Sequence, residues 1–227
     1  MKSFLVFALL LIGISLACSA SKSASSQAPV NGNAQTQPTA PPASVSQQER
    51  EPCTLKLAGA PTINGLRIGM TPDELLALFP GSKDDPEVRA DVSRAPDKLG
   101  RSAIVLKPIT DEAKARFAGV SQVSLTLLDG RVSTFTVSYN GPAYPHVDQF
   151  IEKFVEGKKL PPVDQWEPDA SIGHQLKALK CTDFEVRVFA GGAGGSLNYV
   201  GVKDLIADQK LKERRAKARA AATPTPL

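Results

Sequence analysis

The chain has 227 residues, of which 27 are Lys or Arg and 23 are Asp or Glu, so its formal net charge is +4. The positive excess lies at the two ends, because residues 53–203 hold 18 basic and 18 acidic side chains. This balance argues against a nucleic-acid-binding surface, which needs clustered Lys and Arg. About 150 central residues suffice for one hydrophobic core, so one globular domain is predicted at 52–203.

The N-terminus has the composition of an export signal. Lys2 precedes an apolar run at residues 4–16, and the small residues Ala17 and Ser19 follow close behind. A helix needs about 20 apolar residues to cross the hydrocarbon core of a bilayer, so this run is too short. Residues 1–17 are therefore predicted to be a signal peptide that is cleaved after export.

Cys18 stands at the end of this leader. The stretch ISLAC at residues 14–18 resembles the bacterial lipobox, which implies diacylglycerol on Cys18, acyl chains such as palmitate, and cleavage before the cysteine. Each buried CH₂ contributes about 0.8 kcal/mol, so a lipid with two or more chains anchors a protein stably. A lipoprotein of the cell envelope is thus expected, facing the periplasm or the exterior. Ordinary secretion, with cleavage after Ala17 or Ala20, and a retained anchor are the alternatives.

Residues 18–51 are predicted to be a disordered tether. After Cys18 they are mainly Ser, Ala, Gln, Pro, Asn and Thr, and such a composition buries too little apolar surface to offset the entropy of ordering. A flexible chain of this length holds a domain about 30 Å from its anchor on average. Fully stretched, it reaches about 110 Å.

The two remaining cysteines are Cys53 and Cys181. In an oxidising compartment an even pair is most simply a disulfide, which is predicted here. Two free thiols or a metal pair are the alternatives. The two histidines, His146 and His174, do not form a ligand-spaced cluster with the cysteines, so neither a metal nor a cofactor is predicted.

The first half of the domain begins with a weakly alternating strand expected at 54–57. Thr71-Pro72-Asp73-Glu74 has the composition of a helix start, with an N-cap Thr, Pro at the first helical position and Glu three residues after the cap. The charged stretch at 82–100 is predicted to be an exposed loop, because prolines and a glycine interrupt it. A strand at 102–107 and a helix at 110–119 follow.

A β-hairpin is expected next, with strands at 123–127 and 135–139. A two-residue turn at Asp129-Gly130 would place Leu125 opposite Thr134, which puts apolar and polar residues on the same face. A three-residue loop at 128–130 pairs Val123 with Phe135 and keeps the apolar side chains together. That loop is the prediction.

The second half of the domain has the clearest helical pattern, at 147–157, followed by strands at 174–181, 184–190 and 196–202. The last element is a basic helix at 204–220, in the C-terminal segment 204–227. Its first half is expected to dock on the domain and its second half to project. Helices interspersed among hairpins predict an α+β fold, an antiparallel sheet with helices packed on one face.

Four features of the sequence are candidates for a functional role. The glycine-rich loop at 191–195 lacks the Lys-Ser/Thr and the following helix of a phosphate site, so a hairpin connection is predicted. Trp166 is expected at the edge of the core, with a ligand anchor as the alternative. The basic tail either is a solvated helix end or meets anionic headgroups or an acidic wall polymer. His146 and His174 have no sequence-local catalytic partner, and no catalytic residues are predicted.

The segment at 66–75, LRIGMTPDEL, resembles the strand-to-helix opening of BamE/SmpA-type envelope lipoprotein domains, where a Gly-Met-Thr turn leads into the first helix. The resemblance covers about 15 residues and implies a non-catalytic binding or assembly domain on a lipid anchor. A protein or an envelope polymer is the expected partner, together with the membrane and without nucleic acid. The alternative is an exported enzyme, a hydrolase whose site is assembled from dispersed residues.

Overall fold

A computed structural model of the protein describes residues 51–191 and 197–222, and all of them belong to one compact unit. The predicted signal peptide, Cys18 and nearly all of the predicted tether lie outside the described residues.

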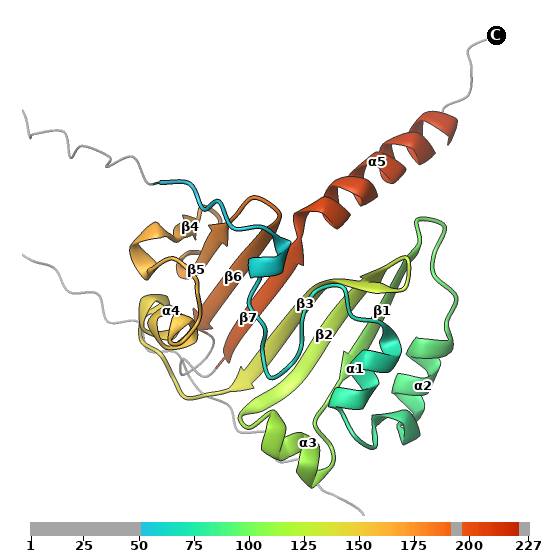
Figure 1. The fold of residues 1–227 in the computed structure, drawn as a ribbon, viewed down its shortest axis with the longest axis horizontal. Coiled ribbons are helices and arrows are strands. Elements are labelled where there is room, and N and C mark those ends of the chain that lie inside the picture. Colours follow the sequence, from blue (N-terminus) through green and yellow to red (C-terminus); the bar gives the residue numbers. More distant parts are fainter. Residues whose placement is uncertain (1–50, 192–196, 223–227) are drawn as a thin grey trace, which may run out of the picture. The chain divides into compact units, whose positions relative to one another are not determined.

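A single antiparallel sheet of seven strands forms the centre of this domain (Figure 1). Its spatial order is β1-β2-β3-β7-β6-β5-β4. The strands are β1 (Arg101–Leu106), β2 (Val120–Leu128), β3 (Arg131–Asn140), β4 (Glu167–Asp169), β5 (Gly173–Lys180), β6 (Phe184–Gly191) and β7 (Leu197–Asp204). The predicted α+β class is confirmed, because every strand pair is antiparallel and helices connect several of them.

Four of the five helices lie on the same face of the sheet, and the fifth extends past its end (Figure 1). The helices are α1 (Pro72–Leu78), α2 (Pro86–Ser93), α3 (Asp111–Arg116), α4 (Val147–Val155) and α5 (Leu205–Ala222), with short 3-10 turns at Leu57–Gly59, Ser82–Asp84 and Val163–Gln165. Apolar side chains of the sheet alternate toward the helix-covered face, where Phe135, Val137, Val186, Val188 and Val200 are fully buried. The expected one-sided covering is thus present.

The start of α1 has the capping box that the sequence predicts. The Thr71 side chain accepts a hydrogen bond from the Glu74 backbone N–H, and the Glu74 carboxylate accepts one from the Thr71 N–H at 2.8 Å. Pro72 occupies the first helical position, where its missing N–H costs nothing. The apolar face of α1 buries Leu75 and Leu76 in the core.

Two expected elements near the N-terminal end are wrong. Residues 82–100 are not one exposed loop, because α2 forms there, with the Asp85 side chain accepting from the N–H groups of Glu87 and Val88. Asp85-Pro86 is a sound helix start, and buried Val88 fixes α2 on the domain. Residues 54–57 form no strand of the sheet and run extended into the turn Leu57–Gly59.

The β2–β3 hairpin also differs from its prediction. Leu128 pairs with Arg131, so the turn has two residues, Asp129 and Gly130, both with positive φ. A bulge then shifts the register, because Thr126 pairs with Thr134 while Leu127 pairs with Val132. The extra residue restores the apolar face at the cost of one local irregularity, and the three-residue loop is not needed.

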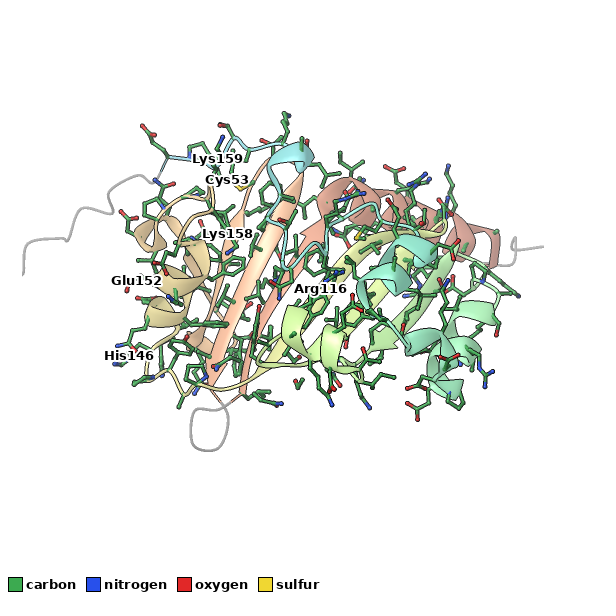
Figure 2. The ribbon with its side chains drawn as sticks, turned by 60° about the horizontal axis from the view of Figure 1, so that its bottom comes forward. Cys53, Arg116, His146, Glu152, Lys158 and Lys159 are labelled. Atoms are coloured by element: carbon green, nitrogen blue, oxygen red, sulfur yellow. A yellow bond between two sulfur atoms is a disulfide. The ribbon has the colours of Figure 1, made fainter. Side chains whose placement is uncertain are left out.

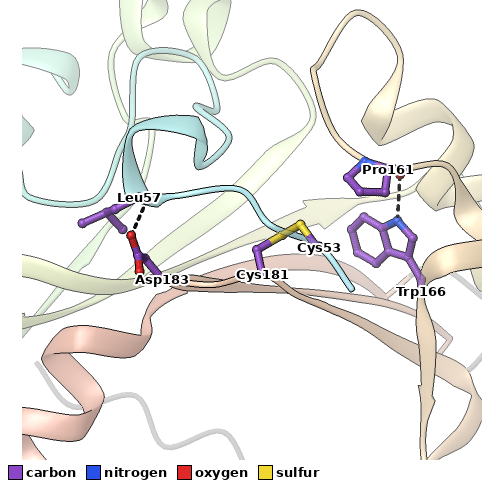
Figure 3. Close-up of a disulfide and its surroundings, with 6 residues drawn as sticks. All are labelled: Cys53, Leu57, Pro161, Trp166, Cys181 and Asp183. Carbon is purple, nitrogen blue, oxygen red and sulfur yellow. Dashed lines mark hydrogen bonds between the residues drawn. A yellow bond between two sulfur atoms is a disulfide. The ribbon is translucent and has the colours of Figure 1, made fainter. Parts of the chain in front are cut away.

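Cys53 and Cys181 form the predicted disulfide (Figure 3). It joins the start of the domain to the turn between β5 and β6. Two more links hold the same segment, because the Thr182 N–H donates to the Leu55 carbonyl at 3.1 Å and the Leu57 N–H donates to the Asp183 carboxylate at 3.2 Å. The chain therefore enters the domain at a covalently fixed point.

Because neighbouring strands are antiparallel, the connections between them lie at two opposite ends of the sheet, which we call the α5 end and the far end. The α5 end holds the β5–β6 turn with Cys181, the β2–β3 turn with Asp129, and the start of α5 at Leu205. The far end holds the last residue of β3, Asn140, beside the first residue of β7, Leu197. With a rise of about 3.3 Å per residue, an eight-residue strand separates the two ends by roughly 25 Å.

Candidate functional site

A cavity of about 330 Å³ opens between α4, the segment after β3, and the turn at residues 63–66. Four aromatic residues line it, and we call it the α4 pocket: Tyr139, Tyr144, Phe150 and Phe154. Its volume is at the lower limit for small-ligand sites, enough for one ring or one large side chain. Tyr139 pairs with Asn198 of β7, which places the pocket toward the far end of the sheet.

The helical pattern of α4 explains how the aromatic walls arise. Phe150 and Phe154 belong to the apolar face that α4 packs against β5 and β6. The ring of Tyr144 stacks on Phe150 with centroids 4.9 Å apart, and Tyr139 meets Phe150 edge-on at 5.7 Å. Such pairs contribute about 0.5–1.5 kcal/mol beyond their buried area, so the wall is preformed.

Two lysines add positive charge beside these rings. The Lys158 ammonium lies 4.7 Å from the centroid of the Phe154 ring and donates to the Phe154 carbonyl at 2.6 Å. Partial burial lowers the pKa of Lys158. Lys153 is exposed and pairs with Glu156 at 2.7 Å. The pocket thus combines apolar walls with two ammonium groups, a setting that favours an apolar group carrying a carboxylate.

Residues from two other segments line the opposite side of the pocket. Thr62 and Asn64 line it from the turn that the Ile63–Leu66 bridge closes, and Pro142 lines it from the segment after β3. Behind Pro142, the fully buried Asn198 donates its side-chain N–H to the Pro142 carbonyl at 2.6 Å. The Asn198 carbonyl oxygen has no hydrogen-bond partner among the described residues, which is an unusual state for a buried acceptor.

Burial raises the pKa of Tyr139 from 10.0 to about 12. Between these values the folded state keeps the phenol proton while the unfolded state loses it, so the free energy of unfolding falls as the pH rises. We expect this loss to be absent in Tyr139→Phe, with urea unfolding curves across that pH range as the measurement. Equal alkaline loss in both proteins would show that Tyr139 titrates normally.

The face of the sheet without helices carries a second aromatic pair. Leu176, Phe189, Tyr199 and Ser138 follow one another across β5, β6, β7 and β3. The rings of Phe189 and Tyr199 stack with centroids 5.1 Å apart and both are half-buried. Leu197, on the same face, is 50% exposed. We call this surface the open face.

The two histidines do not come together. His146 precedes α4, its side chain makes no cap hydrogen bond, and it is exposed at the outer edge of the domain (Figure 2). His174 is exposed on β5. Neither lines the α4 pocket. The described residues therefore do not contain the arrangement that would favour a hydrolase, a histidine in a pocket beside a carboxylate and a hydroxyl.

Trp166 is a core residue. Its side chain is 1% exposed, and its indole N–H donates to the Pro161 carbonyl at 3.1 Å (Figure 3). The expectation of a core-edge tryptophan is confirmed, and the ligand-anchor alternative fails because no solvent reaches the ring. The glycine-rich loop joins two antiparallel strands, β6 and β7, as predicted. Residues 192–196 of that loop lie outside the described residues.

Within 51–191 and 197–222, no group of three or more His, Cys, Asp or Glu side chains is placed to hold a metal ion. No helix in those ranges has the length and apolar character needed to cross a membrane.

Comparison with known proteins found no family model, no curated protein and no solved structure that matches the chain. The BamE/SmpA resemblance therefore stays a prediction.

Proposed function

We propose that the chain is a membrane-anchored lipoprotein of the bacterial cell envelope whose folded domain is a non-catalytic binding module for a protein partner. Lipid on Cys18 holds the chain at the membrane, and the tether at 19–50 gives the domain its reach. The α4 pocket takes one apolar side chain of the partner, with an adjacent carboxylate beside Lys153 and Lys158. An assembly role like the one that the BamE/SmpA resemblance implies is compatible with this function.

The observation that carries the proposal is the α4 pocket itself, which has aromatic walls and two lysines and reaches the far end of the sheet at Tyr139. Protein interfaces concentrate their binding energy where an aromatic or aliphatic anchor fills a preformed pocket. The far end also lies opposite the covalently fixed entry of the chain at Cys53. The part of the pocket at Tyr139 therefore lies away from the point where the described chain enters the domain.

Site-specific photocrosslinking in the native envelope tests this function. A photoreactive phenylalanine analogue at Asn64, on the pocket rim, is expected to give a discrete protein adduct, and Tyr144→Ala is expected to remove it. The matched control is Tyr199→Ala, because Tyr199 also stacks on a phenylalanine but on the open face. This control should keep the adduct.

The two tyrosine variants also separate the competing surfaces. Loss of the adduct in Tyr199→Ala alone would assign binding to the open face and contradict the pocket proposal. An adduct to a carbohydrate polymer in place of a protein would contradict the class of partner. The absence of any adduct at Asn64 would contradict both.

A further inference from the structure

The C-terminal helix α5 is clamped to the domain at a defined point. The Arg214 guanidinium donates two hydrogen bonds to the Asp129 carboxylate, each at 2.8 Å, and a third to the Leu99 carbonyl at 2.7 Å. Lys210, one turn earlier, donates to the same carboxylate at 2.8 Å. Charge-assisted bidentate bonds of this kind fix direction as well as position.

We call the contacts of Lys210 and Arg214 with Asp129 the clamp, and the backbone at Gly100 leaves room for them. Gly100 has φ +82°, and a Cβ there would lie 2.5 Å from an Asp129 oxygen and 2.6 Å from an Arg214 nitrogen. The Asp129 N–H donates to the Gly100 carbonyl at 2.9 Å, which positions the carboxylate. Arg214 and Lys210 together hold the pKa of Asp129 well below its ordinary value. These contacts therefore fix the position of α5 on the domain.

Beyond the clamp the helix has only positive charge. Arg215, Lys217 and Arg219 fall in the last eight residues of α5, and no acidic residue occurs after Glu213. At 100° per residue Arg215 and Arg219 lie about 40° apart on one side of the helix, and Lys217 lies on nearly the opposite side. Figure 1 shows this part of α5 extending away from the sheet. We call residues 215–222 the arm.

The arm and the entry of the chain lie at the same end of the sheet. Cys53 is bonded to Cys181 in the β5–β6 turn, and the Leu205 N–H, at the start of α5, donates to the Asp183 carbonyl of that turn at 2.9 Å. Beside this junction, Ile206 has the largest exposed fraction among the exposed large hydrophobic side chains, 59%. The entry of the described chain at Cys53, the exposed isoleucine and the start of the helix that carries the arm therefore share one end of the domain.

We infer that the arm binds the anionic headgroups of the membrane in which the lipid of Cys18 is inserted, and so orients the domain with its α5 end toward the bilayer. The inference depends on the proposed lipid anchor for its biological setting. The predicted tether alone would leave the domain free to rotate, whereas a cationic helix clamped at the end of the domain where the described chain enters gives one orientation the lowest energy. The part of the α4 pocket at Tyr139, toward the far end of the sheet, then lies away from the membrane.

Vesicle flotation of the chain from Ser19 to Leu227 tests the arm without the lipid. This chain keeps every described residue. We expect binding to phosphatidylglycerol-containing vesicles at low salt and none to pure phosphatidylcholine. Each Lys or Arg near a charged surface strengthens binding roughly fivefold, so the triple variant Arg215→Gln, Lys217→Gln, Arg219→Gln should lower the partition coefficient by on the order of a hundredfold. Added salt should weaken binding of the unchanged chain.

The matched control is Lys107→Gln, Lys114→Gln, Arg116→Gln, which removes the same charge at the far end of β1 and on α3. It should bind almost as well as the unchanged chain, and both variants should keep the urea midpoint. Equal weakening in the two variants, no vesicle binding at all, or binding only to a soluble acidic polymer would overturn the inference. Because the assay contains neither lipidated Cys18 nor a partner, its failure would leave the proposed function standing.

Discussion

Replacing both disulfide cysteines, as Cys53→Ser with Cys181→Ser, is expected to lower the free energy of unfolding by about 4–5 kcal/mol. The bridge joins positions 128 residues apart, and closing so long a loop removes much of the entropy of the unfolded chain. A domain of this size is typically stable by only about 5–15 kcal/mol, so the variant should be close to unfolding at 37 °C.

Urea unfolding followed by circular dichroism measures this loss. The disulfide also holds the segment at 53–57 against the β5–β6 turn, where the Thr182–Leu55 and Asp183–Leu57 hydrogen bonds and the Lys56–Asp183 ion pair would remain. Hydrogen exchange should therefore show early opening of this segment in the variant. Unchanged midpoints for the oxidised protein and the double serine variant would contradict the role of the bridge.

Trp166→Ala is expected to destabilise the domain by about 3–5 kcal/mol, the usual cost of deleting a large buried aromatic side chain. The ring is 1% exposed and belongs to the main hydrophobic core. Trp166→Phe keeps most of the buried area but leaves the Pro161 carbonyl without its indole donor, so a smaller loss of about 1–3 kcal/mol is expected.

Urea midpoints of the two tryptophan variants distinguish a core residue from a binding residue. A core role predicts the order of stability wild type, then Trp166→Phe, then Trp166→Ala, with the Asn64 adduct unaffected wherever the domain is folded. A Trp166→Ala protein of normal stability that has lost the adduct would show that the indole contacts the partner after all.

Helices with local signals could be predicted from the sequence. The capping box of Thr71 and Glu74 is written in four consecutive residues, and the structure reproduces both of its hydrogen bonds. Helix α4 is predictable because its buried residues recur at helical spacing over about two turns. Helix α2 was missed because a run of charges outweighed the equally local Asp85-Pro86 start.

The register of the β2–β3 hairpin could not be predicted from the local sequence. Asp129-Gly130 is the commonest kind of two-residue turn, yet simple alternation ruled it out, because a uniform register would have placed Leu125 opposite Thr134. The structure pairs Leu125 with Phe135 by means of a bulge near Ser133. Burial of both strands on one face decides the register here, and this is a property of the whole sheet.

The α4 pocket could not be predicted residue by residue. Tyr139, Tyr144 and Phe150 come from three separate segments, and their contact depends on the chain turning back after β3. One signal was available, since two prolines and a tyrosine follow β3 in the segment GPAYP at 141–145. A rigid aromatic segment directly before an amphipathic helix is a reasonable place to look for a preformed wall.

The mass of the mature N-terminal peptide, taken from the native membrane, tests the central claim most directly. Lipid on Cys18 is the basis of the anchor, the tether and the orientation proposed for α5. We predict a mature chain that starts at Cys18 and carries a diacylglyceryl group with further acylation, lost from the membrane fraction in Cys18→Ala. A mature chain that starts at Cys18 without lipid or at Ser21, or an intact leader in the cytosol, would contradict the account.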